Sequence, residues 1–210
     1  MKKVVHINLG GRPFAIDTDA YETLDKYLLA IERHFKNSDG FEDIMYDIEN
    51  RIAELMEEKN KNTVISMADV EKIKNTMGRP EQFSEDEPAS ETSSSRSDYS
   101  KYRTGRRLFR DPDDSVMGGV AAGLSKYFGI TDPIFIRLLF VLFTISGGLG
   151  LIVYIILWIS VPEAKTSSDY LAMRGEDINI DNIAKTVEDG LKNIKSTIDD
   201  ISKGIKMKML

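Results

Sequence analysis

The chain contains no cysteine, and its only histidines are His6 and His34 among 210 residues. Without cysteine it can form neither a disulfide framework nor a thiolate zinc site. The histidines form no H-x-x-x-H or H-E-x-x-H pattern, and Walker, G-x-G-x-x-G and G-x-S-x-G motifs are missing as well. We therefore expect no catalytic, cofactor-binding or metal-binding residues, and no enzyme activity.

Charge is missing from one long stretch, although 30% of the chain is charged. Residues 138–161, LLFVLFTISGGLGLIVYIILWISV, hold 24 residues without a charge. As a helix they would reach about 36 Å, against about 30 Å of membrane hydrocarbon. The pattern predicts one transmembrane helix over about 133–161. The alternative is a re-entrant hairpin broken at Gly147, Gly148 and Gly150, since glycines both weaken helices and permit close helix contact.

The residues around this run are those expected at a membrane surface. Tyr154 and Trp158 lie near its end, where interfacial aromatic residues are common. Residues 101–137 hold seven basic and four acidic side chains, which favours a cytoplasmic N-terminal side. We expect five of these basic side chains to contact anionic lipid headgroups: Arg106, Arg107, Arg110, Lys126 and Arg137.

A second apolar segment lies just before the run, and it is too short to span a membrane. Residues 115–129 are predicted to form an interfacial helix that carries Gly119 and Gly123 in a G-x-x-x-G pair. One interpretation is an anchor that steadies the span, and the other is a docking surface or a sensor of lipid packing. Together with Gly147, Gly148 and Gly150, this pair forms the predicted set of helix-contact residues.

The N-terminal 83 residues predict a small α-rich domain, so the fold class of the chain is mainly α. Runs at Val4–Leu9 and Phe14–Ile16 flank Gly10-Gly11, which is typical of a β-hairpin. Three helices are expected over about 19–36, with Thr18 as the cap, over about 41–59, and from the capping box at Ser66 to Gly78. Their apolar stripes recur at steps of three and four, so each helix can cover the others.

Two further regions complete the predicted organisation. Residues 84–105 begin with a serine-rich, acidic stretch that has almost no apolar side chain, and we expect a disordered linker. Residues 163–210 form a C-terminal tail with an amphipathic helix over about 178–208. This helix either lies on the protein or the membrane, or self-associates as a coiled coil through the seam Leu191, Ile194, Ile198, Ile201 and Ile205.

Residues 106–162 resemble the phage shock protein C (PspC) domain. The similarity rests on RRLFR, then GGVAAGLSKYFGI, DP, IRLLFVLF and YIILWISVP in this order. Residues 1–83 also resemble the small helical domain that precedes such modules in some bacteria, through ISMADVEKIKNTMGRPEQF.

This resemblance implies a single-pass protein of the bacterial inner membrane that acts in the envelope stress response. It also implies PspA-like and PspB-like protein partners, beside anionic lipid and a possible homo-oligomer. The sequence favours a non-catalytic signalling or scaffold protein. The alternatives are a membrane-tethered DNA-binding regulator, disfavoured because residues 1–83 are acidic, and a purely structural membrane protein.

Overall fold

The computed structural model describes residues 3–59, 64–78 and 106–208, with side chains up to residue 203. The described part of the chain is mainly helical with one small β-hairpin, which confirms the mainly α fold class. It divides into two compact units, one of residues 1–99 and 179–210 and the other of residues 100–178. The linker expected over 84–105 lies outside the described residues.

The N-terminal β-hairpin of the first unit is present as the glycine pair predicted. Strands β1 (Val4–Leu9) and β2 (Arg12–Asp17) pair antiparallel around Gly10 and Gly11, both of which have positive φ. The second strand is longer than expected at both ends. Its Ile16 is fully buried and forms a parallel bridge with Ile65, which ties the hairpin to the segment before the third helix.

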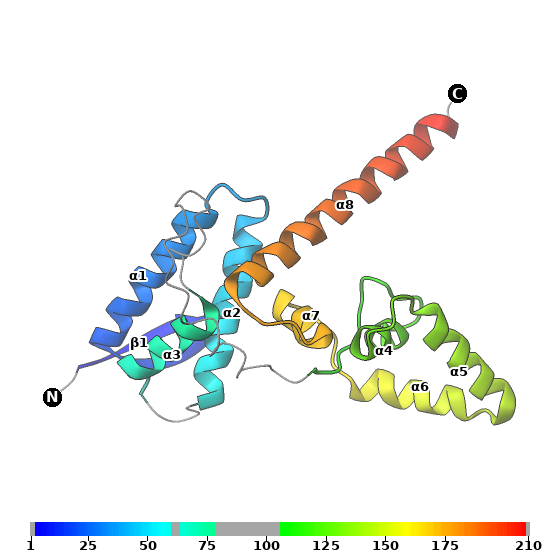
Figure 1. The fold of residues 1–210 in the computed structure, drawn as a ribbon, viewed down its shortest axis with the longest axis horizontal. Helices are drawn as coiled ribbons and strands as arrows, with labels where there is room; N and C mark the ends of the chain where they lie inside the picture. The colour runs from blue at the N-terminus through cyan, green and yellow to red at the C-terminus, as the bar shows by residue number, and fades with distance from the viewer. Residues whose placement is uncertain (1–2, 60–63, 79–105, 209–210) are drawn as a thin grey trace, which may run out of the picture. The chain divides into compact units, whose positions relative to one another are not determined.

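Helices α1 (Thr18–Phe35) and α2 (Phe41–Lys59) pack on this hairpin, and α3 (Met67–Met77) packs on α1 and α2 (Figure 1). The capping box at Ser66 is confirmed, because its backbone N–H donates to the Asp69 carboxylate. The core consists of side chains from all three helices, including Leu24, Ile31, Ile44, Ile48, Ile52, Val70 and Met77.

The N-cap of the first helix differs from the prediction. Asp17, and not Thr18, is its N-cap, because the Thr18 hydroxyl donates to the Lys3 carbonyl oxygen instead. Tyr21 is exposed, whereas Tyr27 is buried and donates its hydroxyl to the Gly78 carbonyl at 2.7 Å. This hydrogen bond gives the buried Tyr27 hydroxyl a partner in an apolar environment. The spacing of apolar residues along the helix does not reveal it.

The C-terminal helix α8 (Ile180–Lys208) belongs to the first unit. Ile180, Ile183 and Ala184 at its start are buried, and the helix packs against α2. Its amphipathic character is as predicted. The N-terminal half of the helix uses this character to cover the domain, and the helix then extends beyond α1 and α2 (Figure 1).

The second unit contains four helices among its described residues: α4 (Val120–Phe128), α5 (Ile134–Gly147), α6 (Leu149–Ser160) and α7 (Ser167–Arg174). α5 and α6 run antiparallel, side by side (Figure 1). α7 packs against α4, so residues 163–178, which we expected to belong to a tail, complete this unit.

The predicted single transmembrane helix over 133–161 is wrong. Gly148, with φ of +76°, separates α5 from α6 and reverses the chain, so the apolar run forms a helical hairpin. Within the described part of the chain, no helix has both the length and the apolar character that a membrane crossing requires.

The interfacial helix predicted over 115–129 also needs correction. Gly118 and Gly119 adopt positive φ, so α4 starts only at Val120. Val120, Ala121 and Ala122 are buried against neighbouring elements of the same unit. α4 is therefore a core helix of this unit.

Candidate functional site

The helical hairpin of α5 and α6 depends on a close approach of its two helices near the turn. A Cβ atom on Gly150 would lie 2.4 Å from the Phe140 carbonyl oxygen, so only glycine fits there. The Thr144 hydroxyl donates to the same oxygen at 2.7 Å, and the Gly148 N–H donates to the Thr144 carbonyl. Further along the hairpin, the rings of Phe140 and Tyr154 meet edge to face at 5.0 Å.

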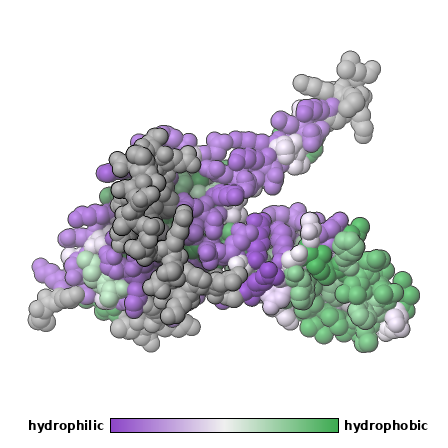
Figure 2. Space-filling model, in the orientation of Figure 1, coloured by the Kyte–Doolittle hydropathy of each residue, from purple (hydrophilic) through white to green (hydrophobic). Residues whose placement is uncertain are grey.

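The outer surface of this hairpin is apolar over its whole length. Arg137 is the only charged residue of α5 and α6. Figure 2 shows hydrophobic side chains gathered over these two helices. A soluble monomer rarely exposes so large an apolar patch. The exposed side chains include Phe135, Leu138, Leu142, Phe143, Ile145, Leu149, Ile152, Ile156 and Ile159.

Both ends of the hairpin emerge from one base, which joins the chain before α4 to the chain after α6. The backbone N–H of Arg110 donates to the Pro162 carbonyl at 2.8 Å, and the N–H of Ala164 donates to the Arg110 carbonyl at 2.9 Å. The Arg110 guanidinium donates to the carbonyls of Val161 and Gly118 and pairs with Glu163 at 3.3 Å. The segments on either side of the apolar run therefore lie side by side.

A buried carboxylate secures α4 to this base. Asp111 is fully buried, and its Oδ2 atom lies 2.6 Å from the Lys126 ammonium of α4. The ammonium also lies 5.1 Å from the centre of the Tyr170 ring. Burial and a hydrogen bond to Asp113 raise the pKa of the Tyr170 hydroxyl. The Asp111–Lys126 pair fixes α4 to the base, because removing either partner would leave an uncompensated charge.

The predicted glycine pair of α4 serves this internal packing. A Cβ atom on Gly119 would lie 2.2 Å from the Asp111 carbonyl oxygen, and one on Gly123 would lie 2.0 Å from the Phe109 carbonyl oxygen. Both glycines thus face a segment of their own chain. Gly150 makes a helix contact inside the hairpin, whereas Gly147 and Gly148 face open space.

Most of the basic residues expected at lipid headgroups have partners within the protein. Arg110 and Lys126 hold the base, and Arg106 donates to the Tyr127 carbonyl oxygen at 2.7 Å. Arg137 pairs with Asp114 at 2.9 Å. Arg107 is exposed, with no side-chain partner among the described residues. The basic cluster therefore builds the base of the hairpin in addition to any contact with lipid.

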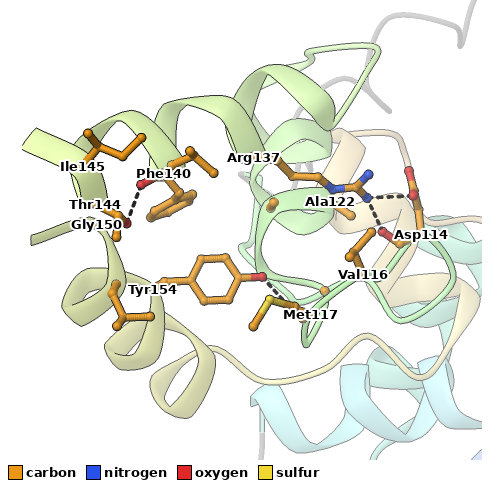
Figure 3. A pocket seen from close by; sticks show the side chains of 14 residues that line it. Asp114, Val116, Met117, Ala122, Arg137, Phe140, Thr144, Ile145, Gly150 and Tyr154 are labelled. Carbon is orange, nitrogen blue, oxygen red and sulfur yellow. Dashed lines mark hydrogen bonds and ion pairs between the residues drawn. The ribbon is translucent and has the colours of Figure 1, made fainter. Parts of the chain in front are cut away.

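The two aromatic residues expected at a membrane interface differ in their surroundings. Tyr154 points between α5 and α4, where its hydroxyl donates to the Met117 carbonyl (Figure 3). Trp158 is about half exposed and lies against Gly118, where any Cβ atom would meet its indole ring. Trp158 is thus the more exposed of the two aromatic side chains, and Tyr154 is partly exposed with its hydroxyl bound inside the unit.

The predicted seam of α8 lies partly against the other elements of the first unit and is partly exposed to solvent. Leu191 contacts Gly40, and the Lys195 ammonium pairs with Asp39 at 2.6 Å and lowers the pKa of that carboxyl. The seam residues Ile194, Ile198 and Ile201 are exposed. The side chain of Ile205 lies outside the described ones.

Asp111 and Glu163 of the base, and α7, which packs against α4, were not predicted from the sequence. Asp111 belongs to the acidic turn DPDD between basic residues, a pattern that could have indicated ion pairs. α7 is preceded by a capping box of Thr166 and Asp169 and followed by Gly175, and both features are visible in the sequence.

The second unit is thus a small helical domain that presents an apolar hairpin on a base of ion pairs. The sequence model of the PspC domain matches residues 106–164, which comprise this base, α4 and the hairpin. No curated protein and no solved structure matches the chain. Residues 106–164 therefore match the PspC domain, a type of domain that is typically associated with membranes and that suggests a link to the phage-shock type of stress response.

Proposed function

We propose that the chain is a non-catalytic signalling and scaffold protein of the bacterial inner membrane in the envelope stress response. In this proposal the hairpin of α5 and α6 enters the membrane from one side, and the base remains at the surface. The first unit and α8 stay in the cytoplasm, where they bind protein partners. A change in lipid contact at the hairpin or in helix association would carry the signal.

The observation that carries this proposal is the exposed apolar surface of the hairpin. α5 and α6, with 14 and 12 residues, reach about 21 Å and 18 Å, or about two thirds of the hydrocarbon thickness. Each exposed large apolar side chain that moves from water into lipid contributes about 1.5–3 kcal/mol. The turn contains only Gly148 outside the helices, so few backbone groups lack an intramolecular hydrogen bond in the hydrocarbon.

The base determines the topology that we propose. Because Arg110 binds Val161 and Glu163, the segments before and after the hairpin remain on the same face of the membrane. Basic residues close to a membrane segment favour the cytoplasmic face. Arg106 and Arg107 lie in one of these flanking segments, so we place both flanks in the cytoplasm.

Protein partners are the remaining part of the proposal. The family resemblance implies PspA-like and PspB-like partners, and a second copy of the chain is a further candidate. The exposed isoleucines of α8 support helix association, because they continue a heptad seam past the point where the protein covers it.

The absence of cysteine allows a direct test of the topology. Ser115→Cys and Lys165→Cys each introduce one thiol at an exposed position on either side of the hairpin. We expect the full chain to sediment with membranes, and a membrane-impermeant maleimide to label both positions only from the cytoplasmic side. Labelling of the two positions from opposite sides, or a chain that stays in the supernatant, would contradict the proposal.

A further inference from the structure

The second unit contains a cavity between α4, α5 and α6, to which the proposed function assigns no role. Its volume is about 350 Å³, which is in the range of small-molecule sites. Val141 and Leu151 are among its lining residues, together with Met117 and Ala122, which Figure 3 labels. The walls are almost entirely carbon, since the hydroxyls of Thr144 and Tyr154 already donate to backbone carbonyls.

One end of this cavity is charged. The Arg137 Nη2 atom donates to the carboxylate and to the carbonyl oxygen of Asp114, both at 2.9 Å. Both side chains are partly exposed, at 32% and 54%, so a ligand can reach them from water. Arg137 lies in the first turn of α5, next to the base, where a membrane surface would lie if the hairpin were inserted.

The other end opens toward the turn of the hairpin. Ile145 and Leu151 line the cavity there, and both also belong to the exposed apolar surface of α5 and α6. A long apolar ligand could thus enter sideways from lipid. A helix is about 10–12 Å wide with its side chains, so a cavity of this volume is too small to hold one.

We propose that this cavity holds one acyl chain of a membrane phospholipid, whose phosphodiester lies at Arg137. Guanidinium groups bind phosphate oxygens through short, charge-assisted hydrogen bonds, and the partly exposed Arg137 can make them. The acyl chain would fill the carbon-lined walls as far as Ile145. This inference rests on the proposed membrane insertion, because insertion brings lipid to the cavity.

The test compares two neighbouring positions with similar exposure. Leu151 lines the cavity, and Ile152, which is 56% exposed against 53% for Leu151, does not. Full-length wild type, Leu151→Trp and Ile152→Trp would be washed extensively in detergent, and the retained phospholipid quantified by mass spectrometry. We expect about one phospholipid per chain in the wild type and in Ile152→Trp, and about a tenfold loss in Leu151→Trp because the indole occupies the cavity.

Two further measurements keep this test decisive. Arg137→Gln should reduce retention about tenfold through loss of the charged contact, with circular dichroism to check that the helices persist. Vesicle flotation should remain unchanged in all variants. Equal retention in all variants, or no retained lipid in a wild type that still floats, overturns the cavity site and leaves the membrane hairpin standing. A wild type that does not float overturns the proposed function itself.

A photoreactive side chain identifies the occupant. In Val141→benzoylphenylalanine the probe lies at the wall of the cavity. We expect ultraviolet irradiation in membranes to yield a phospholipid adduct at this position. Adducts formed only with a second copy or another protein would overturn the proposal.

Discussion

Individual glycines determine how closely the elements of the second unit approach each other. At Gly123 the missing side chain allows α4 to lie against the Phe109 carbonyl oxygen, and at Gly150 it allows α6 to lie against α5. The same residue type at Gly147 meets nothing within 4 Å. Spacing in a sequence cannot separate these cases, because it does not show which neighbour each glycine faces.

This difference gives a prediction at the scale of a single residue. Gly123→Ala should lower the stability of the second unit by about 2–3 kcal/mol, because the added methyl group would collide with backbone at 2.0 Å. Gly147→Ala is the matched control within the same unit, and it should be neutral or slightly stabilising. Thermal unfolding of the full chain in detergent measures both effects. Equal unfolding temperatures would show that the segment at Phe109 can move away from α4.

At the scale of the element, the helical hairpin is the feature that separates the structure from the sequence-based prediction. The sequence indicates the length and the apolar character of residues 133–161, and it identifies the glycines as a possible break. The decision between one helix and two depends on contacts distant in sequence. Arg110 contacts Val161 and Glu163, and periodicity does not reveal such pairs.

The helices of the first unit could be predicted far more completely. α2, α3 and α8 match their expected ranges to within about two residues, a normal uncertainty for helix ends. Their stripes, caps and glycine stops are local features. The base of the hairpin was predicted only in part. Arg110, Lys126 and Arg137 were expected to contact lipid. Their ion pairs with Glu163, Asp111 and Asp114, respectively, were not predicted.

A distance measurement tests the hairpin as an element. Spin labels at Ile134→Cys and Ser160→Cys mark the start of α5 and the end of α6. A continuous helix would separate the two backbone positions by about 39 Å, whereas the antiparallel hairpin brings both to the base. We expect a clearly shorter distance by double electron–electron resonance in membranes.

The variant with Gly148→Leu and Gly150→Leu provides the contrast to this measurement. Leucine at position 148 would have to adopt a left-handed conformation, and at position 150 it would collide with α5. The distance should therefore lengthen in this variant. A wild-type distance near that of a continuous helix would refute the hairpin.

At the scale of the whole molecule, two apolar surfaces lie in different units and require different partners. The hairpin surface is broad, and Arg137 is its only charged residue. A surface of this kind suits contact with lipid. The stripe on α8 is a single line of isoleucines between charged residues such as Lys192, Asp199 and Lys203. Such a narrow seam on a polar helix suits another helix better than a bilayer.

The α8 stripe should therefore mediate assembly of the chain. Ile198→Lys places a charge in the middle of the exposed seam and should reduce cross-linking between full-length chains in detergent about tenfold or more. Ser196→Lys adds the same charge to an exposed position off the seam and should leave cross-linking unchanged. If Ile198→Lys weakened vesicle binding and left cross-linking intact, the stripe would face lipid instead, and α8 would act as a second membrane contact. Because the stripe continues the seam that covers α2, loss of assembly without loss of folding would show that one helix face serves both the domain and its partner.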